Sequence, residues 1–246
     1  MYNRYVMFMK LFITDYDGTL FIDEDSLNEN IKYLKELQKN DFKIVISTGR
    51  GYPSIKNQID TYNIPCDYLS CADGSVIYDR DGNVLKMYEM NHEIIDTFTE
   101  FYQTLNYEEI QFSYPTGYSN ILNTNDTLLG INICISTPNY NNDIVNSFLR
   151  IKDSFPEYNY LTYRHPIFSY LCIKPGNISK SATIRYLKDT YNIDDNDIYV
   201  IGDSDNDYAM IKDFNGSCME DSTIEILDIA KNKYKNVSDF IKDILN

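Results

Sequence analysis

The sequence Lys10-Leu-Phe-Ile-Thr-Asp15-Tyr-Asp-Gly-Thr-Leu20 lies near the start of the chain. Its first five residues form a short, mostly apolar run, which is typical of a buried strand, and the Asp-x-Asp-Gly sequence that follows is typical of a loop. Because alternate residues of an extended chain point to the same side, Asp15 and Asp17 are expected to face one crevice at the end of this strand. Gly18 lets the chain turn sharply behind them. An Asx-turn with a helix N-cap is the alternative interpretation.

The segments that flank this sequence predict a parallel sheet. Apolar residues recur at helical spacing over 28–40, and an apolar run over 43–47 predicts a second strand. A strand, a helix and a strand in that order form the unit of a parallel sheet with a crossover helix. A helix that ends near Tyr62 and a strand over 68–71 extend the pattern, which returns after Gly176.

Between these two parts, the pattern changes to mainly antiparallel strands. Asp79-Arg-Asp-Gly-Asn83 separates two apolar runs and is a strong hairpin signal. The helices and strands predicted after it cover 93–105, 110–114, 118–122, 131–136, 143–152, 158–163 and 168–173. We therefore predict an α/β core with a Rossmann-like parallel sheet, formed by residues 1–78 and 176–246, and an inserted α+β domain formed by residues 79–175.

The composition argues against several classes of protein. A formal net charge of -15 would repel the phosphate backbone of a nucleic acid, so no nucleic-acid partner is predicted. No stretch approaches the roughly 18 apolar residues of a membrane span, so no membrane association is predicted either. The 5 cysteines are scattered without a Cys-x-x-Cys pair, as expected for reduced cysteines in a cytoplasmic protein. The sequence carries no signal for an oligomeric state.

A second acidic group, Gly202-Asp-Ser-Asp-Asn-Asp207, follows a strand predicted over 198–201. In a parallel sheet, Asp203 and Asp207 would reach the edge where the first acidic pair lies. Four converging carboxylates need a cation, and ligands that are all oxygen suit Mg²⁺ held partly by a substrate phosphate. Acids in the first turn of a helix are also favoured by the helix dipole, which is the alternative interpretation.

Two basic residues occupy positions where they could contact phosphate. Ser47-Thr-Gly-Arg50 ends the second predicted strand, and it offers the Thr48 hydroxyl and the Arg50 guanidinium, although such a turn also begins many helices. Lys180 follows Ser179, a predicted N-cap, and a cation at this end of a helix is disfavoured by about 0.3–1 kcal/mol. A local rule broken in this way indicates a functional site, whereas a lysine that points into water is the plain alternative.

These four segments, in this order, resemble the motifs of the haloacid dehalogenase-like superfamily. The position of the insertion and the sequence Gly202-Asp-Ser-Asp-Asn-Asp-Tyr-Ala-Met210 resemble its Cof-type phosphatases. The resemblance spans the whole chain. It implies an Mg²⁺-dependent phosphatase that acts on a small phosphorylated metabolite through an aspartyl-phosphate, with residues 79–175 as a cap that sets specificity.

The resemblance also implies a role for each candidate residue. The implied roles are the nucleophile Asp15, the general acid and base Asp17, the phosphoryl holders Thr48 and Lys180, the substrate contacts Gly49 and Arg50, and the magnesium ligands Asp15, Asp203, the main-chain carbonyl of Asp17 and, through water, Asp207. A phosphomutase of the same superfamily and a non-catalytic phosphate-binding regulatory protein remain open as alternatives. The presence of both Asp15 and Asp17 argues against a loss of chemistry.

Two positions depart from the pattern of this family. Ala72-Asp73-Gly-Ser75 stands where Asn-Gly-Ala is usual, and Met219-Glu-Asp-Ser222 stands where Met-Gly-Asn-Ala is usual. The carboxylates of Asp73 and Asp221 would be unfavourable near a phosphate unless they reach the metal or face away. These departures bear on the substrate contacts more than on the nucleophile.

Overall fold

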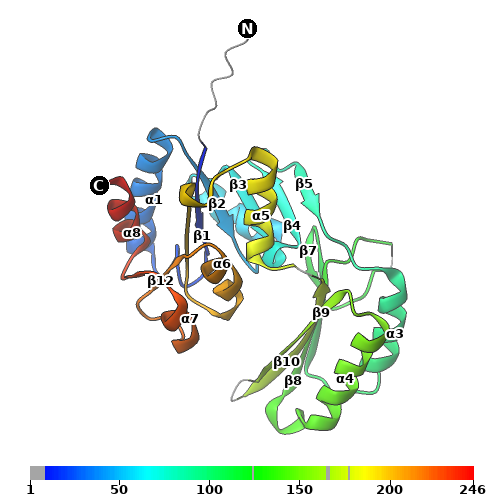
Figure 1. Cartoon of the computed structure of the whole chain (residues 1–246). Helices are drawn as coiled ribbons and strands as arrows, with labels where there is room; N and C mark the ends of the chain where they lie inside the picture. The colour runs from blue at the N-terminus through cyan, green and yellow to red at the C-terminus, as the bar shows by residue number, and fades with distance from the viewer. Residues whose placement is uncertain (1–8, 124, 165–166, 177) are drawn as a thin grey trace. The chain divides into compact units, whose positions relative to one another are not determined.

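The computed structural model describes residues 9–123, 125–164, 167–176 and 178–246. The chain divides into two compact units (Figure 1). The core unit contains Met1–Gly49, Asn57–Leu85 and Ser179–Asn246, of which residues 1–8 lie outside the described part, and the inserted unit contains Arg50–Lys56 and Lys86–Ile178. The predicted class, an α/β core with an inserted α+β domain, is confirmed.

An eight-stranded sheet forms the centre of the core unit, in the order β13-β12-β11-β1-β2-β3-β4-β5. Its strands are β1 (Lys10–Thr14), β2 (Phe42–Ser47), β3 (Tyr68–Cys71), β4 (Val76–Asp79), β5 (Val84–Met87), β11 (Ile198–Gly202), β12 (Ser217–Met219) and β13 (Lys233–Tyr234). The pairs from β13 to β3 are parallel, and β3 pairs with β4 in the antiparallel direction. Strand β1 is therefore central, which explains its nearly continuous apolar sequence.

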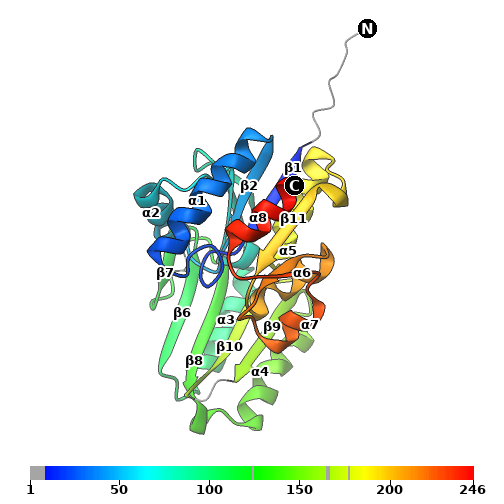
Figure 2. The same cartoon turned by 90° about the vertical axis from the view of Figure 1, so that its left-hand side faces the viewer.

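Helices cover both faces of this sheet (Figure 2). They are α1 (Glu24–Lys39), α2 (Tyr52–Tyr62), α5 (Lys180–Tyr191), α6 (Tyr208–Asp213), α7 (Ile224–Ile229) and α8 (Val237–Leu245). Leu11 and Ile13 of β1 belong to the apolar cluster that contains residues of α5 and α6. Phe12, which alternates with them, packs against Phe240 of α8 with the rings tilted and 5.7 Å between their centroids. Successive side chains of β1 point to opposite faces of the sheet, so this strand packs against the helices on both faces.

The helix predicted over 28–40 begins earlier in the structure. Helix α1 begins at Glu24 rather than at residue 28, because Asp23 and Ser26 form a capping box in which Ser26 N donates to Asp23 Oδ1 over 2.8 Å. After β11, the chain forms a 3₁₀ turn, Asp205–Asp207, that leads into α6. The signal at Asp23 was present in the sequence but lay outside the apolar repeat.

A buried asparagine connects the loop after β1 to two helices. Asn30 of α1 is fully buried; its Nδ2 donates to the carbonyl of Leu20 over 3.0 Å, and its Oδ1 accepts from Ser238 N over 2.8 Å. The second bond satisfies an N–H group in the first turn of α8, where no main-chain acceptor is available. Asn30 therefore fixes the loop that carries Asp15 against both α1 and α8.

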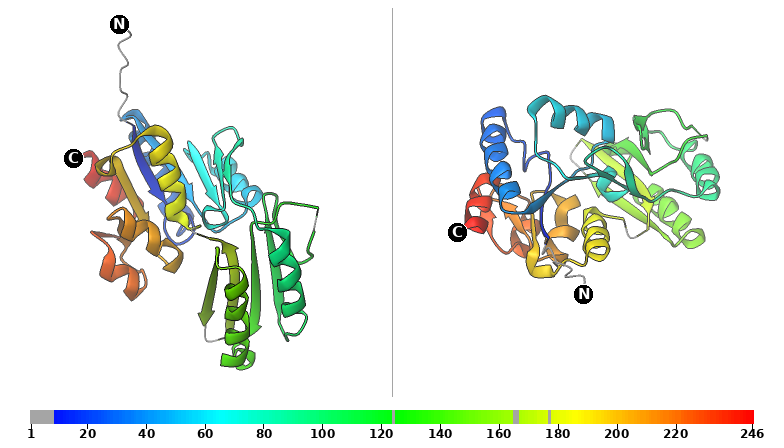
Figure 3. Two further views of the ribbon diagram at one scale, coloured as in Figure 1. Left: turned by 45° about the vertical axis from the view of Figure 1, so that its right-hand side comes forward. Right: turned by 90° about the horizontal axis from the view of Figure 1, so that it is seen from above.

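The inserted unit is a five-stranded antiparallel sheet with two helices on one face (Figure 3). The strand order is β7-β6-β8-β10-β9. The elements are α3 (His92–Tyr102), β6 (Glu109–Tyr114), β7 (Gly117–Ser119), β8 (Gly130–Ser136), α4 (Asn142–Ser154), β9 (Tyr158–Arg164) and β10 (Phe168–Pro175). Phe98 of α3 and Phe148 of α4 meet edge to face at 6.4 Å and lie in one apolar cluster with Ile133 of β8. The unit therefore has a core of its own.

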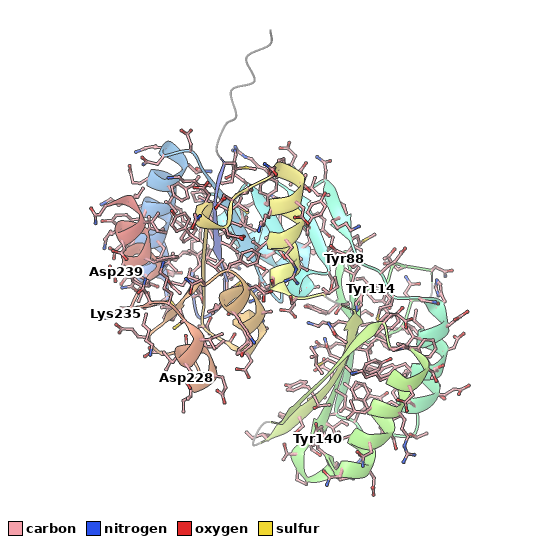
Figure 4. All side chains as sticks on the ribbon, viewed as in Figure 1. Tyr88, Tyr114, Tyr140, Asp228, Lys235 and Asp239 are labelled. Carbon is pink, nitrogen blue, oxygen red and sulfur yellow. The ribbon has the colours of Figure 1, made fainter. Side chains whose placement is uncertain are left out.

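The limits predicted for the inserted domain, 79–175, differ from those of the compact units. Strand β5 is hydrogen-bonded to β4 in the core sheet, and the division falls after Leu85, inside β5. The hairpin signal was correct, but it could not tell which sheet the hairpin would join. Strand β7 is also shorter than predicted, because the hydroxyl of Tyr114 (labelled in Figure 4) accepts from Asn123 N over 2.7 Å and holds a loop in place. No helix within the described ranges combines the length and apolar character that a membrane span needs.

Candidate active site

The candidate residues of the core unit gather at the carboxyl edge of the parallel strands. Asp15 follows β1, Thr48 follows β2 and Asp203 follows β11. Because β1 lies between β2 and β11 in parallel, the three strand ends share one edge. Asp15 N donates to the carbonyl of Ile201 over 3.1 Å, so the main chain stays paired up to Asp15. The structure therefore places these three residues at one edge of the sheet.

Lys180 is the first residue of α5, and its side chain is completely buried. Its Nζ donates to Asp15 Oδ1 over 2.5 Å and to Asp207 Oδ1 over 2.6 Å. Ser179 is the N-cap, as predicted, although its side chain makes no capping bond. The cost of a cation at the positive end of a helix is thus offset by two carboxylates, so Lys180 does not point into water.

The start of α5 is fixed by a close approach of two main chains. Gly74 has φ +98, and a Cβ atom at this position would lie 2.3 Å from the carbonyl oxygen of Ser179. No side chain larger than hydrogen fits there without a shift of the backbone. The turn after β3 therefore fixes the position at which α5 begins, and with it the position of Lys180.

Three acidic residues within the described ranges could hold a metal ion together. One ligand oxygen each of Asp15, Asp203 and Asp207 lies within 4.8 Å of the others. Both oxygens of Asp207 have partners, because Oδ1 accepts from Lys180 while Oδ2 accepts from the N–H groups of Asp203, at 2.9 Å, and Ser204, at 3.1 Å. Asp203 Oδ1 accepts from the hydroxyl of Thr19. Asp203 is thus held by a residue distant in the sequence, whereas Asp207 is held by Lys180 and by the main chain of its own loop.

The pKa shifts of these residues indicate that the group has too little positive charge to balance its carboxylates. Burial raises the pKa of Asp15 to about 8, although Lys180 acts in the opposite direction. Burial also raises the pKa of Asp203. For Lys180, the effect of burial is outweighed by the charges of Asp207 and Asp15, and its pKa is raised. One lysine cannot neutralise three carboxylates, and the oxygen-only donor set fits a hard divalent cation such as Mg²⁺.

We expect Asp15 to make the stability of the metal-free protein depend on pH. Its pKa is higher in the folded protein, at about 8, than its ordinary value of 3.8, so the folded state binds this proton more tightly. The contribution of Asp15 to the free energy of unfolding therefore falls as the pH rises from about 4 to about 8. Asp15→Asn removes the group, so the variant should lose less stability than the wild type between about pH 5 and about pH 8.

Urea denaturation in excess chelator at these two pH values measures this difference. Asp189→Asn, at the exposed far end of α5, is the matched control and should keep the slope of the wild type. Parallel stability curves for wild type and Asp15→Asn would contradict the burial of a titrating carboxyl at this position.

The other candidate residues occupy different surroundings. The side chain of Asp17 is exposed and is not part of the three-acid group, so the metal contact predicted for it stays with its main-chain carbonyl as a prediction. Thr48 is buried; its N–H donates to Ser70 O over 2.9 Å. Gly49 ends the first segment of the core unit, whereas Arg50 is grouped with the inserted unit.

Asp73 and Asn206 contact each other beside the candidate residues, a contact that the sequence did not predict. Asn206 Nδ2 donates to Asp73 Oδ1 over 3.0 Å. The departure of Asp73 from the family pattern was a signal, but it did not show whether the side chain faces the site. Asn206 belongs to the motif Gly202-Asp-Ser-Asp-Asn-Asp207, but no role was predicted for its side chain. Asp221 lies exposed in the turn after β12.

A model of the haloacid dehalogenase-like hydrolases matches residues 12–147 and 120–239. The chain belongs to the haloacid dehalogenase-like hydrolases. It is therefore an enzyme of the hydrolase class, and its order of motifs agrees with the resemblance seen in the sequence.

Related haloacid dehalogenase-like proteins include bacterial phosphatases. MG265 of Mycoplasma genitalium is 22% identical over 97% of this chain and 99% of its own length. The 5-amino-6-(5-phospho-D-ribitylamino)uracil phosphatase YcsE of Bacillus subtilis is 25% identical over 83% of this chain and 81% of its own length. Among solved structures, the phosphatase BT1666 of Bacteroides thetaiotaomicron is 18% identical, with a TM-score of 0.76 over 99% of this chain and 96% of its own. The sugar phosphatase BT4131 is 15% identical, with a TM-score of 0.74 over 96% and 98%. At these identities, the solved structures establish the shared fold.

Proposed function

We propose that the chain is an Mg²⁺-dependent phosphatase that hydrolyses small phosphomonoesters through a phosphorylated Asp15. The observation that supports this most directly is the buried Lys180, whose Nζ bridges Asp15 and Asp207 beside Asp203. A lysine held against a carboxylate at the end of a central strand is placed to neutralise a phosphoryl group that this carboxylate attacks.

The reaction proceeds in two steps that use groups of this chain. The Asp15 carboxylate attacks phosphorus in line; the bond to the leaving oxygen breaks, and Asp17 gives that oxygen its proton. Asp17 then takes a proton from water, which attacks the aspartyl-phosphate, regenerates Asp15 and releases inorganic phosphate. Thr48 and Lys180 hold the phosphoryl oxygens throughout.

Asp15, Asp203 and the carbonyl of Asp17 would hold Mg²⁺, and Asp207, whose oxygens both have protein partners, would reach it through water. The bound ion supplies positive charge that offsets the negative charge of the phosphoryl oxygens. The oxygen-only donor set and the raised pKa of Asp15 support this assignment.

The substrates best supported are sugar phosphates and related phosphomonoesters of small metabolites. The relatives named above include a sugar phosphatase and a phosphatase whose named substrate carries a phosphorylated ribityl chain. The inserted unit has its own core and contains none of the proposed catalytic or metal-binding residues, so we assign to it the selection of substrate.

We expect hydrolysis of a generic phosphomonoester to depend on Mg²⁺. Excess chelator should lower turnover by about 10²-fold or more, because the acidic group would otherwise repel a phosphate dianion, and added Mg²⁺ should restore it. Release of inorganic phosphate, measured with p-nitrophenyl phosphate, reports the effect, and circular dichroism shows that the chelated protein stays folded. Full turnover in chelator would refute the role of the metal. Conversion of a sugar phosphate into its isomer, without free phosphate, would instead identify a phosphomutase.

A further inference from the structure

The turn after β3 holds Asp73 in an uncommon conformation. Ala72 and Asp73 have φ values of 49 and 54, in the left-handed region that side chains other than those of Asn and Asp rarely adopt. Asp73 N donates to the carbonyl of Thr48 over 3.0 Å. Asn206 Nδ2, in the loop after β11, donates to Asp73 Oδ1 over 3.0 Å. The carboxylate is therefore fixed between the end of β2 and the second acidic loop.

This carboxylate lies against the segment proposed to hold the phosphoryl group. A Cβ atom at Gly49 would come within 3.1 Å of Asp73 Oδ1. The charge of Asp73 therefore lies next to the main chain of Gly49, the residue that follows Thr48. Asp73 also acts on Lys180: burial lowers the pKa of this lysine, and the charge of Asp73 is among those that more than compensate for it. Lys180 therefore interacts with the charge of a fourth carboxylate, that of Asp73, in addition to the three-acid group.

We propose that Asp73 is a positioning residue whose negative charge, placed beside Gly49 and acting on Lys180, weakens the binding of phosphate and so favours its release after hydrolysis. This inference rests on the proposed function, because it assumes that Thr48 and Lys180 hold a phosphoryl group. A negative charge beside the segment that binds a dianion opposes that binding, whether or not the carboxylate has hydrogen-bond partners. The penalty acts on bound substrate, transition state and product alike, so it should appear in affinity and KM more than in the chemical step.

Asp73→Asn isolates the charge from the hydrogen bond. Asparagine tolerates positive φ and can still accept from Asn206, so the variant differs from the wild type mainly by one unit of charge. The experiment measures the affinity of the full chain for inorganic phosphate by calorimetry in the presence of Mg²⁺, together with KM and kcat for one phosphomonoester. We expect the Kd for phosphate and the KM to fall about tenfold or more in Asp73→Asn.

Asp189→Asn, on the exposed far end of α5, removes the same charge far along the helix from Lys180 and should leave both values unchanged. Asp73→Gly provides a second variant that removes the charge and suits the positive φ, and it should also bind phosphate more tightly. Equal or weaker phosphate binding by both Asp73 variants would overturn the inference, even if the wild type hydrolyses phosphomonoesters. A wild type that neither hydrolyses phosphomonoesters nor binds phosphate with Mg²⁺ would instead overturn the proposed function and, with it, this role of Asp73.

Discussion

Asp15→Asn is expected to abolish hydrolysis, with turnover reduced by about 10⁴-fold or more, because the amide cannot attack phosphorus and no phosphoenzyme can form. The side chain keeps its shape and can still accept from Lys180, so the loss would not reflect unfolding. The initial rate of phosphate release, with and without the substitution, gives this result.

Asp17→Asn is the matched comparison, since the two aspartates are chemically alike and two residues apart. This change keeps the nucleophile but removes the proton donor, and general acid and base catalysis is typically worth about 10²–10⁴-fold. Slow phosphorylation of Asp15 should persist with an activated ester whose leaving group needs no proton. Rapid-quench labelling followed by peptide mapping separates the two variants. A phosphoryl label on any residue other than Asp15 would overturn the mechanism.

Lys180→Met should lower both the activity and the stability of the protein. Methionine is unbranched and one atom shorter than lysine, and it removes the donor to Asp15 and Asp207, which leaves two buried carboxylates without their shared cation. Breaking a buried pair in this way costs about 3–5 kcal/mol of unfolding free energy, and losing one charge-stabilising donor costs about 10²–10³-fold in turnover. Urea denaturation and steady-state kinetics, both with saturating Mg²⁺, measure the two effects.

Lys188→Met is a control in the same helix. Lys188 pairs with Asp195 at the surface, where an ion pair contributes about 0–1 kcal/mol, so stability and turnover should change little. If Lys180→Met were as active as this control, Lys180 could not be the group that stabilises the transferred phosphoryl.

Local patterns in the sequence determined the elements and the class of fold. The apolar run before Asp15 predicted a buried strand, and the structure forms β1 there, at the centre of the parallel sheet. Ser179 predicted the start of α5, and this placed Lys180 at its first position. These features depend on residues within one or two turns of one another, so they can be inferred from spacing alone.

The tertiary structure decided which of these residues meet. Lys180 and Asp15 are 165 positions apart, and Asn206 and Asp73 are 133 positions apart. Contacts between residues so far apart in the sequence depend on the pairing of β1 with β2 and β11, which no local pattern specifies. The turn of the Asp79–Asn83 hairpin is likewise set by local sequence, but the sheet that its strands join depends on long-range pairing. The sequence by itself therefore determined the strands, the helix start and the candidate residues, whereas only long-range strand pairing and packing joined Lys180, Asp15 and Asp207 into one buried group.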